Sequence, residues 1–142
     1  MQNQITLAAE TAYTGVGLQS GQEVHMVLKP APVDTGIVFV RTDIPERPEI
    51  HAVAENVTST LRATTVEEDG HRVFTIEHLM SAFHALGVDN CLVEMDAEEP
   101  PVAQGNSLAF FELMQQVGFR EQEKERHEIV IDRVYRIDDG ER

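Results

Sequence analysis

Hydrophobic and polar residues alternate along much of the first half of the chain, which is the pattern of strands that bury one face. Apolar residues occupy every second position from Val24 to Leu28, and a β-branched and aromatic run follows Gly36. Glycine, proline and aspartate cluster between these runs and indicate turns. The pattern predicts strands at residues 5–7, 24–29, 36–41, 50–54, 61–66 and 72–74, with turns at 14–17, 20–21, 31–36, 44–45 and 69–70.

The spacing of apolar residues then changes to that of a helix over residues 76–86. Thr75 is placed to cap its N-terminus, and Gly87 is placed to end it in a left-handed conformation. One stripe of this helix is apolar and carries Ile76, Leu79, Met80, Phe83 and Leu86.

A second helix is predicted over residues 107–117, with Asn106 as its N-cap and Gly118 as its terminator. Residues 90–96 form an expected strand between the two helices. Strands followed by helix, strand and helix indicate an α+β domain of two layers, with a small, mostly antiparallel sheet and two helices on one face.

The composition changes after Gly118. Residues 120–128 are charged and have no apolar stripe, so they are predicted to be a linker. A new strand is expected at residues 129–135, and Asp139-Gly140 is a hairpin-turn signal with no returning strand after it. The predicted organisation is a domain at residues 1–120, a linker at 121–127, and at 128–142 the first strand and turn of a second domain.

The charge of the chain limits its partners. Eleven Lys and Arg oppose 25 Asp and Glu, for a net charge of −14, so no nucleic-acid partner is expected. No apolar run approaches the ~20 residues of a membrane helix, so neither a transmembrane segment nor a secretory signal is expected. The single cysteine, Cys91, fits a reducing compartment and a buried strand position.

Glu77 and His78 are the candidate chemical residues because they lie in the first turn of the predicted helix, off its apolar stripe. The positive end of a helix favours an ionised carboxylate and a neutral imidazole, the states needed by a general base and by a metal ligand. Acids are also common in first turns for the dipole alone. Neither a His-Glu-x-x-His pair nor another histidine at ligand-like spacing completes a metal site.

Two glycine-containing turns are weaker candidates. Residues 14–21 lack the third glycine of a dinucleotide fingerprint and the lysine of a phosphate-binding loop, which favours a loop joining two strands. Residues 104–107 could bind an anion through backbone N–H groups, although helix capping is their simplest role.

Four segments in this order resemble one family: Thr14-Gly-Val-Gly-Leu-Gln-Ser-Gly21, Leu28-Lys-Pro-Ala-Pro-Val-Asp-Thr-Gly-Ile-Val-Phe39, Thr75-Ile-Glu-His-Leu-Met-Ser-Ala82 and Ala85-Leu-Gly-Val-Asp-Asn90. Together they are similar to the N-terminal domain of the UDP-3-O-acyl-N-acetylglucosamine deacetylases of lipid A biosynthesis. The resemblance covers about residues 4–139. It implies a fold of the ribosomal protein S5 domain 2-like type, repeated in a second domain, with the active site between the two.

The resemblance also implies a function, a cofactor and site residues. The family is a cytoplasmic, zinc-dependent amidohydrolase of Gram-negative bacteria that removes the N-acetyl group of UDP-3-O-acyl-N-acetylglucosamine. Glu77 matches its general base and His78 its first zinc ligand, while Leu18 and Leu61 fall in segments that border the substrate. The other zinc ligands belong to the second domain, so this chain alone is expected to be inactive.

Two positions depart from the family pattern. Gln19 replaces the usual histidine of the glycine loop, and Gln104 replaces the usual aspartate before the second helix. These departures leave an alternative, a degenerate, non-catalytic module that binds a nucleotide sugar or a partner protein. The Glu77-His78 pair favours the enzyme.

Overall fold

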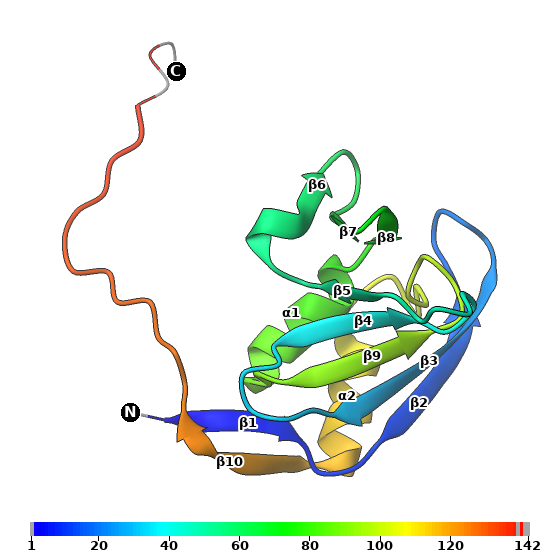
Figure 1. Ribbon diagram of the computed structural model, residues 1–142, viewed down its shortest axis with the longest axis horizontal. Coiled ribbons are helices and arrows are strands. Elements are labelled where there is room, and N and C mark those ends of the chain that lie inside the picture. Colours follow the sequence, from blue (N-terminus) through cyan, green and yellow to red (C-terminus); the bar gives the residue numbers. More distant parts are fainter. Residues whose placement is uncertain (1, 139, 141–142) are drawn as a thin grey trace.

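The computed structural model describes residues 2–138 and 140 (Figure 1). Within these residues, ten strands, two α-helices and one short 3-10 helix form one body, from which residues 127–138 extend. In chain order they are β1 (Asn3–Leu7), β2 (Thr11–Val16), β3 (Glu23–Pro30), β4 (Ile37–Arg41), β5 (Glu49–His51), η1 (Ala54–Asn56), β6 (Val57–Ser59), β7 (Thr65–Glu68), β8 (His71–Phe74), α1 (Glu77–Leu86), β9 (Cys91–Met95), α2 (Leu108–Val117) and β10 (Phe119–Glu125).

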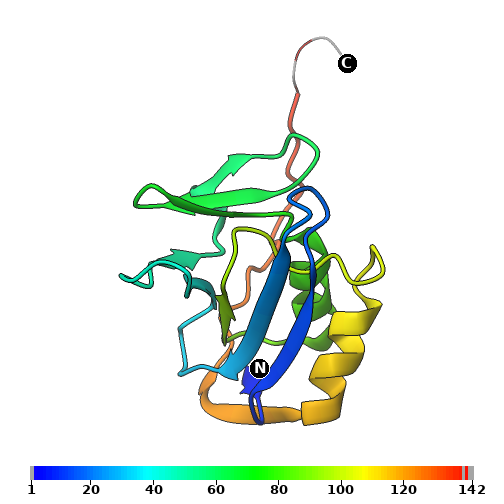
Figure 2. The ribbon, with the colours of Figure 1, turned by 90° about the vertical axis from the view of Figure 1, so that its right-hand side faces the viewer.

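The main sheet has five strands in the order β2-β3-β9-β4-β5. Adjacent strands of this sheet pair antiparallel, except β4 and β9, which run parallel with Phe39 opposite Val93. Both α-helices lie on the same side of this sheet (Figures 1 and 2). The predicted two-layer α+β class is confirmed, whereas its assignment to the ribosomal protein S5 domain 2-like type stays a prediction.

The hydrophobic core fills the space between the main sheet and the helices. The inward residues of β3, β4 and β9 meet the buried sides of α1 and α2, and the largest fully buried apolar side chains are Phe39, Phe83, Phe110, Leu7, Met26, Leu28, Ile50, Leu79, Met95 and Met114. Cys91 is buried in this core as predicted, and burial raises the pKa of its thiol to about 12. The thiolate, which is the reactive form, is therefore disfavoured.

Two smaller sheets flank the main one. Strands β6, β7 and β8 form an antiparallel sheet next to β5 (Figures 1 and 2). In the chain, β8 directly precedes α1. Strands β1 and β10 pair antiparallel near the other end of the body. Strand β2 occupies residues for which the sequence predicts a turn at 14–17; the turn comes after Val16 and joins β2 to β3.

The predicted linker at residues 121–127 is wrong for most of its length, because Phe119–Glu125 is strand β10. This strand exposes charged side chains and is held by backbone pairing with β1, with Leu7 opposite Phe119 and Ile5 opposite Glu121. A search for apolar alternation cannot find such a strand, since few of its side chains are buried.

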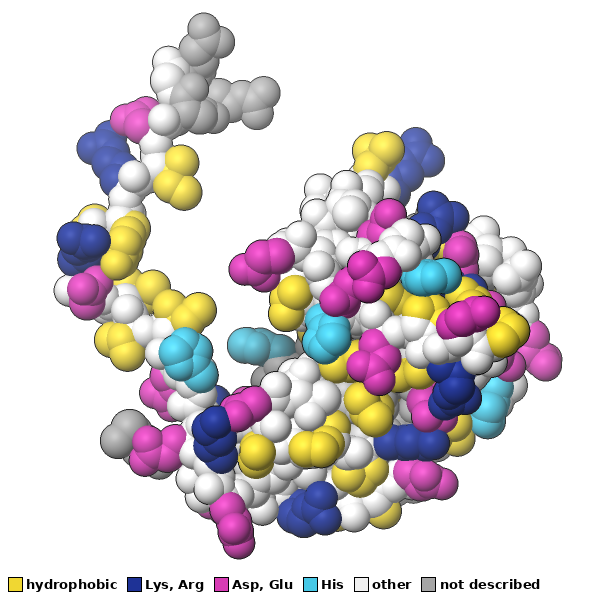
Figure 3. Space-filling model, in the orientation of Figure 1, with side chains coloured by type: hydrophobic (Ala, Val, Ile, Leu, Met, Phe, Trp, Pro, Cys, Tyr) yellow, Lys and Arg dark blue, Asp and Glu magenta, His cyan; other side chains and the backbone are white. Residues whose placement is uncertain are grey.

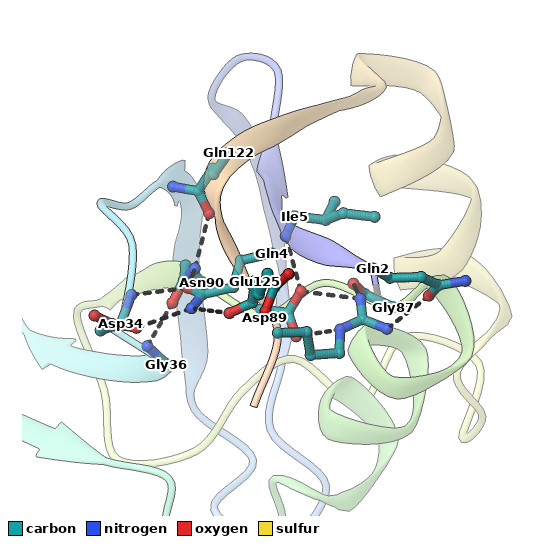
Figure 4. A network of polar contacts seen from close by, with 11 residues as sticks. Gln2, Gln4, Ile5, Asp34, Gly36, Gly87, Asp89, Asn90, Gln122 and Glu125 are labelled. Atoms are coloured by element: carbon teal, nitrogen blue, oxygen red, sulfur yellow. Dashed lines mark hydrogen bonds and ion pairs between the residues drawn. The ribbon is translucent and has the colours of Figure 1, made fainter. Parts of the chain in front are cut away.

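Polar side chains anchor β1 and β10 to the domain (Figure 4). Asn90, only 1% exposed, donates to Gln4 Oε1 and Gln122 Oε1, both at 2.8 Å, and accepts from the Gly36 N–H at 2.8 Å. Gln4 continues the network to Asp34 and to the Glu125 carbonyl. One amide thus joins the first strand, the last strand and the turn before β4.

An ion pair between Arg126 and Asp89 also joins the end of β10 to the loop after α1. Arg126 holds both oxygens of Asp89, at 2.8 and 2.9 Å, and donates to the Gly87 carbonyl at 2.7 Å. Asp89 in turn accepts from the Ile5 N–H at 2.8 Å. The pairing with Asp89 raises the pKa of the Arg126 guanidinium, whereas burial works in the opposite direction.

The ends of the helices follow the predictions in part. Gly87 ends α1 in the left-handed region with φ 67°, and Gly118 follows α2, as predicted. Ser107, and not the predicted Asn106, occupies the N-cap position of α2, although Asn106 Oδ1 does accept from the Leu108 N–H at 2.9 Å. Thr75 does not cap α1, because Ile76 separates it from the helix and its own φ is +56°.

The strand predicted at residues 129–135 does not form in the described chain. These residues are extended and stand away from the body, with hydrophobic side chains along them (Figures 1 and 3). Ile129, Val134 and Ile137 are 86%, 94% and 97% exposed. A strand needs a neighbour for its backbone groups, and these residues have none within residues 2–138. In the predicted Asp139-Gly140 turn, Asp139 lies outside the described residues.

The role of β10 gives a prediction about where the domain ends. A chain that stops after Arg126 should keep a cooperative unfolding transition, because it retains every contact of β10 and of the Asp89 ion pair. A chain that stops after Gly118 should lose the transition, because β1 and Asn90 then lose their partners. Circular dichroism during urea unfolding would measure both; a stable 118-residue domain would contradict the structural role of β10.

Asn90→Ala should destabilise the domain by about 2–4 kcal/mol, because Gln122 Oε1 and the Gly36 N–H would lose their partner and Gln4 Oε1 would keep only the Asp34 N–H. Gln116→Ala, on the exposed side of α2, is the matched control and should change the free energy of unfolding by less than about 0.5 kcal/mol. Urea titration measures both. Equal stability of the two variants would show that the Asn90 network contributes little.

Candidate functional site

Glu77 and His78 begin α1, and both side chains are half-buried rather than packed in the core. The buried side of the helix instead carries Leu79, Ala82 and Phe83. Glu77 Oε2 accepts a hydrogen bond of 3.0 Å from the Thr64 N–H, which ties the carboxylate to the segment before β7. The structure thus places the predicted pair at an accessible helix start, with the carboxylate held by a neighbouring loop.

A mostly apolar groove of about 510 Å³ adjoins Glu77. It lies between α1 and the segment that runs from β5 through η1 to β7, and its apolar lining includes Val53, Val57, Val66, Ile76 and Met80. Val53 and Val57 are 46% and 38% exposed. The carboxylate therefore borders an open apolar surface, which is the usual character of a site for an organic ligand.

The predicted substrate-binding residues Leu18 and Leu61 are both exposed, at 59% and 83%. Leu61 lines a smaller hollow of about 190 Å³ together with Gln19, Arg72 and Phe74. Leu18 lies on the β2–β3 turn beside Gln19. The structure thus brings Gln19 and Leu61 to one hollow, and shows Leu18 as an apolar side chain displayed to solvent.

Sequence reasoning missed Glu99, which lies close to two other acids, Asp96 and Glu98. It is only 1% exposed and accepts hydrogen bonds from the N–H groups of Gln19 and Ser20. Burial works to raise the pKa of Glu99, but the hydrogen bonds from Ser20, Gln19 and Thr75 outweigh burial and lower it. Its position between charged residues and Pro100 gives no spacing signal for this role.

The described residues do not form a metal site by themselves. Between residues 2 and 138, and at 140, no three His, Cys, Asp or Glu side chains are grouped so that they could hold a metal ion. A catalytic zinc normally takes three protein ligands, and His78 is one. The arrangement offers a carboxylate that can accept a proton and an imidazole that can bind one side of a metal, beside an apolar groove.

This α+β domain, with Glu77 and His78 at the accessible start of α1, has relatives among known proteins. The profile of the LpxC family, UDP-3-O-acyl N-acetylglycosamine deacetylase, matches residues 4–142. The chain belongs to this family.

Three relatives carry the name UDP-3-O-acyl-N-acetylglucosamine deacetylase. The chain is 48% identical to the Marinobacter nauticus protein and 46% identical to the Hahella chejuensis protein, over all 142 residues and 47% of each relative. It is 45% identical to the Myxococcus xanthus protein over 140 residues, 99% of the chain and 45% of the relative. The chain therefore spans just under half the length of these relatives.

In the part of the chain that the structure describes, neither α-helix has the length and apolar character required to cross a membrane. Each has ten residues.

The lack of any group of three possible ligands among the described residues predicts weak zinc binding by this chain. After dialysis against zinc and then against buffer, the chain should retain well under one equivalent, because one imidazole offers far less than three ligands. His78→Ala should retain about as much zinc as the unaltered chain. Atomic absorption gives the metal content, and one tightly held equivalent that disappears in His78→Ala would contradict this prediction.

Proposed function

We propose that this chain forms the N-terminal domain of a zinc-dependent deacetylase that hydrolyses the N-acetyl group of UDP-3-O-acyl-N-acetylglucosamine in lipid A biosynthesis. The observation that carries the proposal is the family match over residues 4–142, which includes Glu77 and His78 at the accessible start of α1. The reaction would take place in the cytoplasm, with a second domain as the partner of this one.

In this proposal Glu77 is the general base. Its carboxylate is half-buried at the start of α1. The Thr64 N–H holds one carboxylate oxygen, which leaves the other free to accept a proton. A general base must lie within hydrogen-bond reach of the proton that it takes, and a carboxylate fixed by one oxygen meets that need.

His78 is proposed as one zinc ligand, with the remaining ligands supplied by the second domain. Its ring makes no hydrogen bond to the residues that the structure describes, so no intramolecular partner competes with a metal for it. Leu18 and Leu61 are proposed to contact the substrate, since both present exposed apolar side chains on loops. The apolar groove beside Glu77 supports an organic substrate.

A chimaera tests this function. Residues 1–142 would replace the matched segment of the Marinobacter nauticus relative, which is long enough to supply the remainder of the protein. The chimaera should release acetate from UDP-3-O-acyl-N-acetylglucosamine. Glu77→Ala in the chimaera should lower kcat by about 10²–10⁴-fold with zinc retained, because a positioned base is lost.

His78→Ala in the same chimaera should lose both activity and zinc, which separates the ligand from the base. The unaltered Marinobacter nauticus protein is the control for the assay. A folded chimaera that binds zinc but releases no acetate would support the non-catalytic module instead. Near-normal turnover of Glu77→Ala with zinc bound would show that another group is the base.

A further inference from the structure

The Glu99 carboxylate is held from several sides in the interior. Gln19 N–H lies 3.0 Å from Oε1 and 3.1 Å from Oε2, and Ser20 N–H lies 2.8 Å from Oε2. A buried carboxylate is tolerated only with such donors, and hydrogen bonds to a charged acceptor are stronger than neutral ones. The β2–β3 turn is therefore fastened to the interior by a charge, although Gln19 and Ser20 are themselves exposed.

The turn is shaped to receive this carboxylate. Gly17 is buried beneath it, and a side chain at this position would collide with the Ser20 hydroxyl and with Glu99. Backbone hydrogen bonds from Gly17 N–H to the Gln22 carbonyl and from Gly21 N–H to the Gly17 carbonyl close the turn. The glycine at position 17 is thus explained by the close approach of the carboxylate.

Thr75 links the β2–β3 turn and Glu99 to the start of α1. Gln19 Nε2 donates to Thr75 Oγ1 at 3.1 Å, and the Thr75 hydroxyl is among the groups that lower the pKa of Glu99. Thr75 is buried, and its φ of +56° is unusual for a β-branched residue. Such a conformation persists only when the surroundings impose it. It sets the direction in which the chain enters α1, two residues before Glu77.

We propose that Glu99 is a positioning residue, which fixes the β2–β3 turn against Thr75 and thereby holds Glu77 and His78 in the orientation that the reaction requires. This inference rests on the proposed function for the roles of Glu77 and His78. Glu99 itself is buried behind the turn and acts through Gln19, Ser20 and Thr75, without touching the substrate.

Glu99→Gln tests the proposal because it keeps the size of the side chain but places an amide donor against two N–H donors. Glu98→Gln is the matched control, since Glu98 is the half-exposed neighbour and its side chain binds Arg72. Nuclear magnetic resonance of the 142-residue chain would follow amide exchange and the signals of Glu77 and of the His78 ring.

In the unaltered chain the Gln19 and Ser20 amides should be protected from exchange. In Glu99→Gln they should exchange at least about tenfold faster, a loss of about 1.4 kcal/mol of protection, and the Glu77 and His78 signals should move. In Glu98→Gln none of these should change. Faster exchange with unmoved Glu77 and His78 signals would overturn the proposal, since Glu99 would then anchor only the turn.

If Glu99→Gln does not fold, Gly17→Ala pushes the turn away from an intact carboxylate and should move the same Glu77 and His78 signals; unmoved signals would again overturn the proposal.

In the active chimaera, Glu99→Gln should lower kcat by about 10- to 100-fold with KM within about twofold. An unchanged kcat would overturn the positioning role. A chimaera without activity would count against the proposed function, while the spectra of the 142-residue chain still decide whether Glu99 orients the pair.

Discussion

The buried amide of Asn90 is the interaction on which the rest of the domain depends. It lies at the start of β9, the central strand, and satisfies groups from β1, β10 and the turn before β4. These partners are buried or partly buried, so the loss of Asn90 would leave Gln122 Oε1 and the Gly36 N–H without their partner. The network therefore fixes the relative position of segments that hydrophobic contact alone would leave free to slide.

The pattern of apolar residues was sufficient to predict the core of the fold. The strands around Met26, Phe39 and Val93 and the buried side of α1 follow from spacing, because each buries alternate or helically spaced side chains. Strand β10 could not be predicted in this way, since backbone pairing and the Asn90 network hold it while its side chains remain in water. Polar contacts between residues more than 80 positions apart leave no local trace.

The same distinction applies to the candidate site, where some residues could be predicted from the sequence and others could not. Glu77 and His78 could be found because they depart from the apolar stripe of a helix that is itself predictable, and because the flanking motifs resemble a family. Glu99 could not, since a carboxylate buried by tertiary packing has the same local sequence as one in a solvated turn. The Thr75 conformation was missed for a related reason: its hydroxyl serves the Gln19–Glu99 contact rather than the helix end.

The pairing of the first strand with the last has a consequence for synthesis of the protein. Asn3 and Glu121 are 118 residues apart and meet across β1 and β10. At ribosomal rates, β1 waits about 6–24 s for its partner to be made. During that time the backbone groups of β1 are open to other chains. Folding of this domain is thus completed only after residue 125 has emerged from the ribosome.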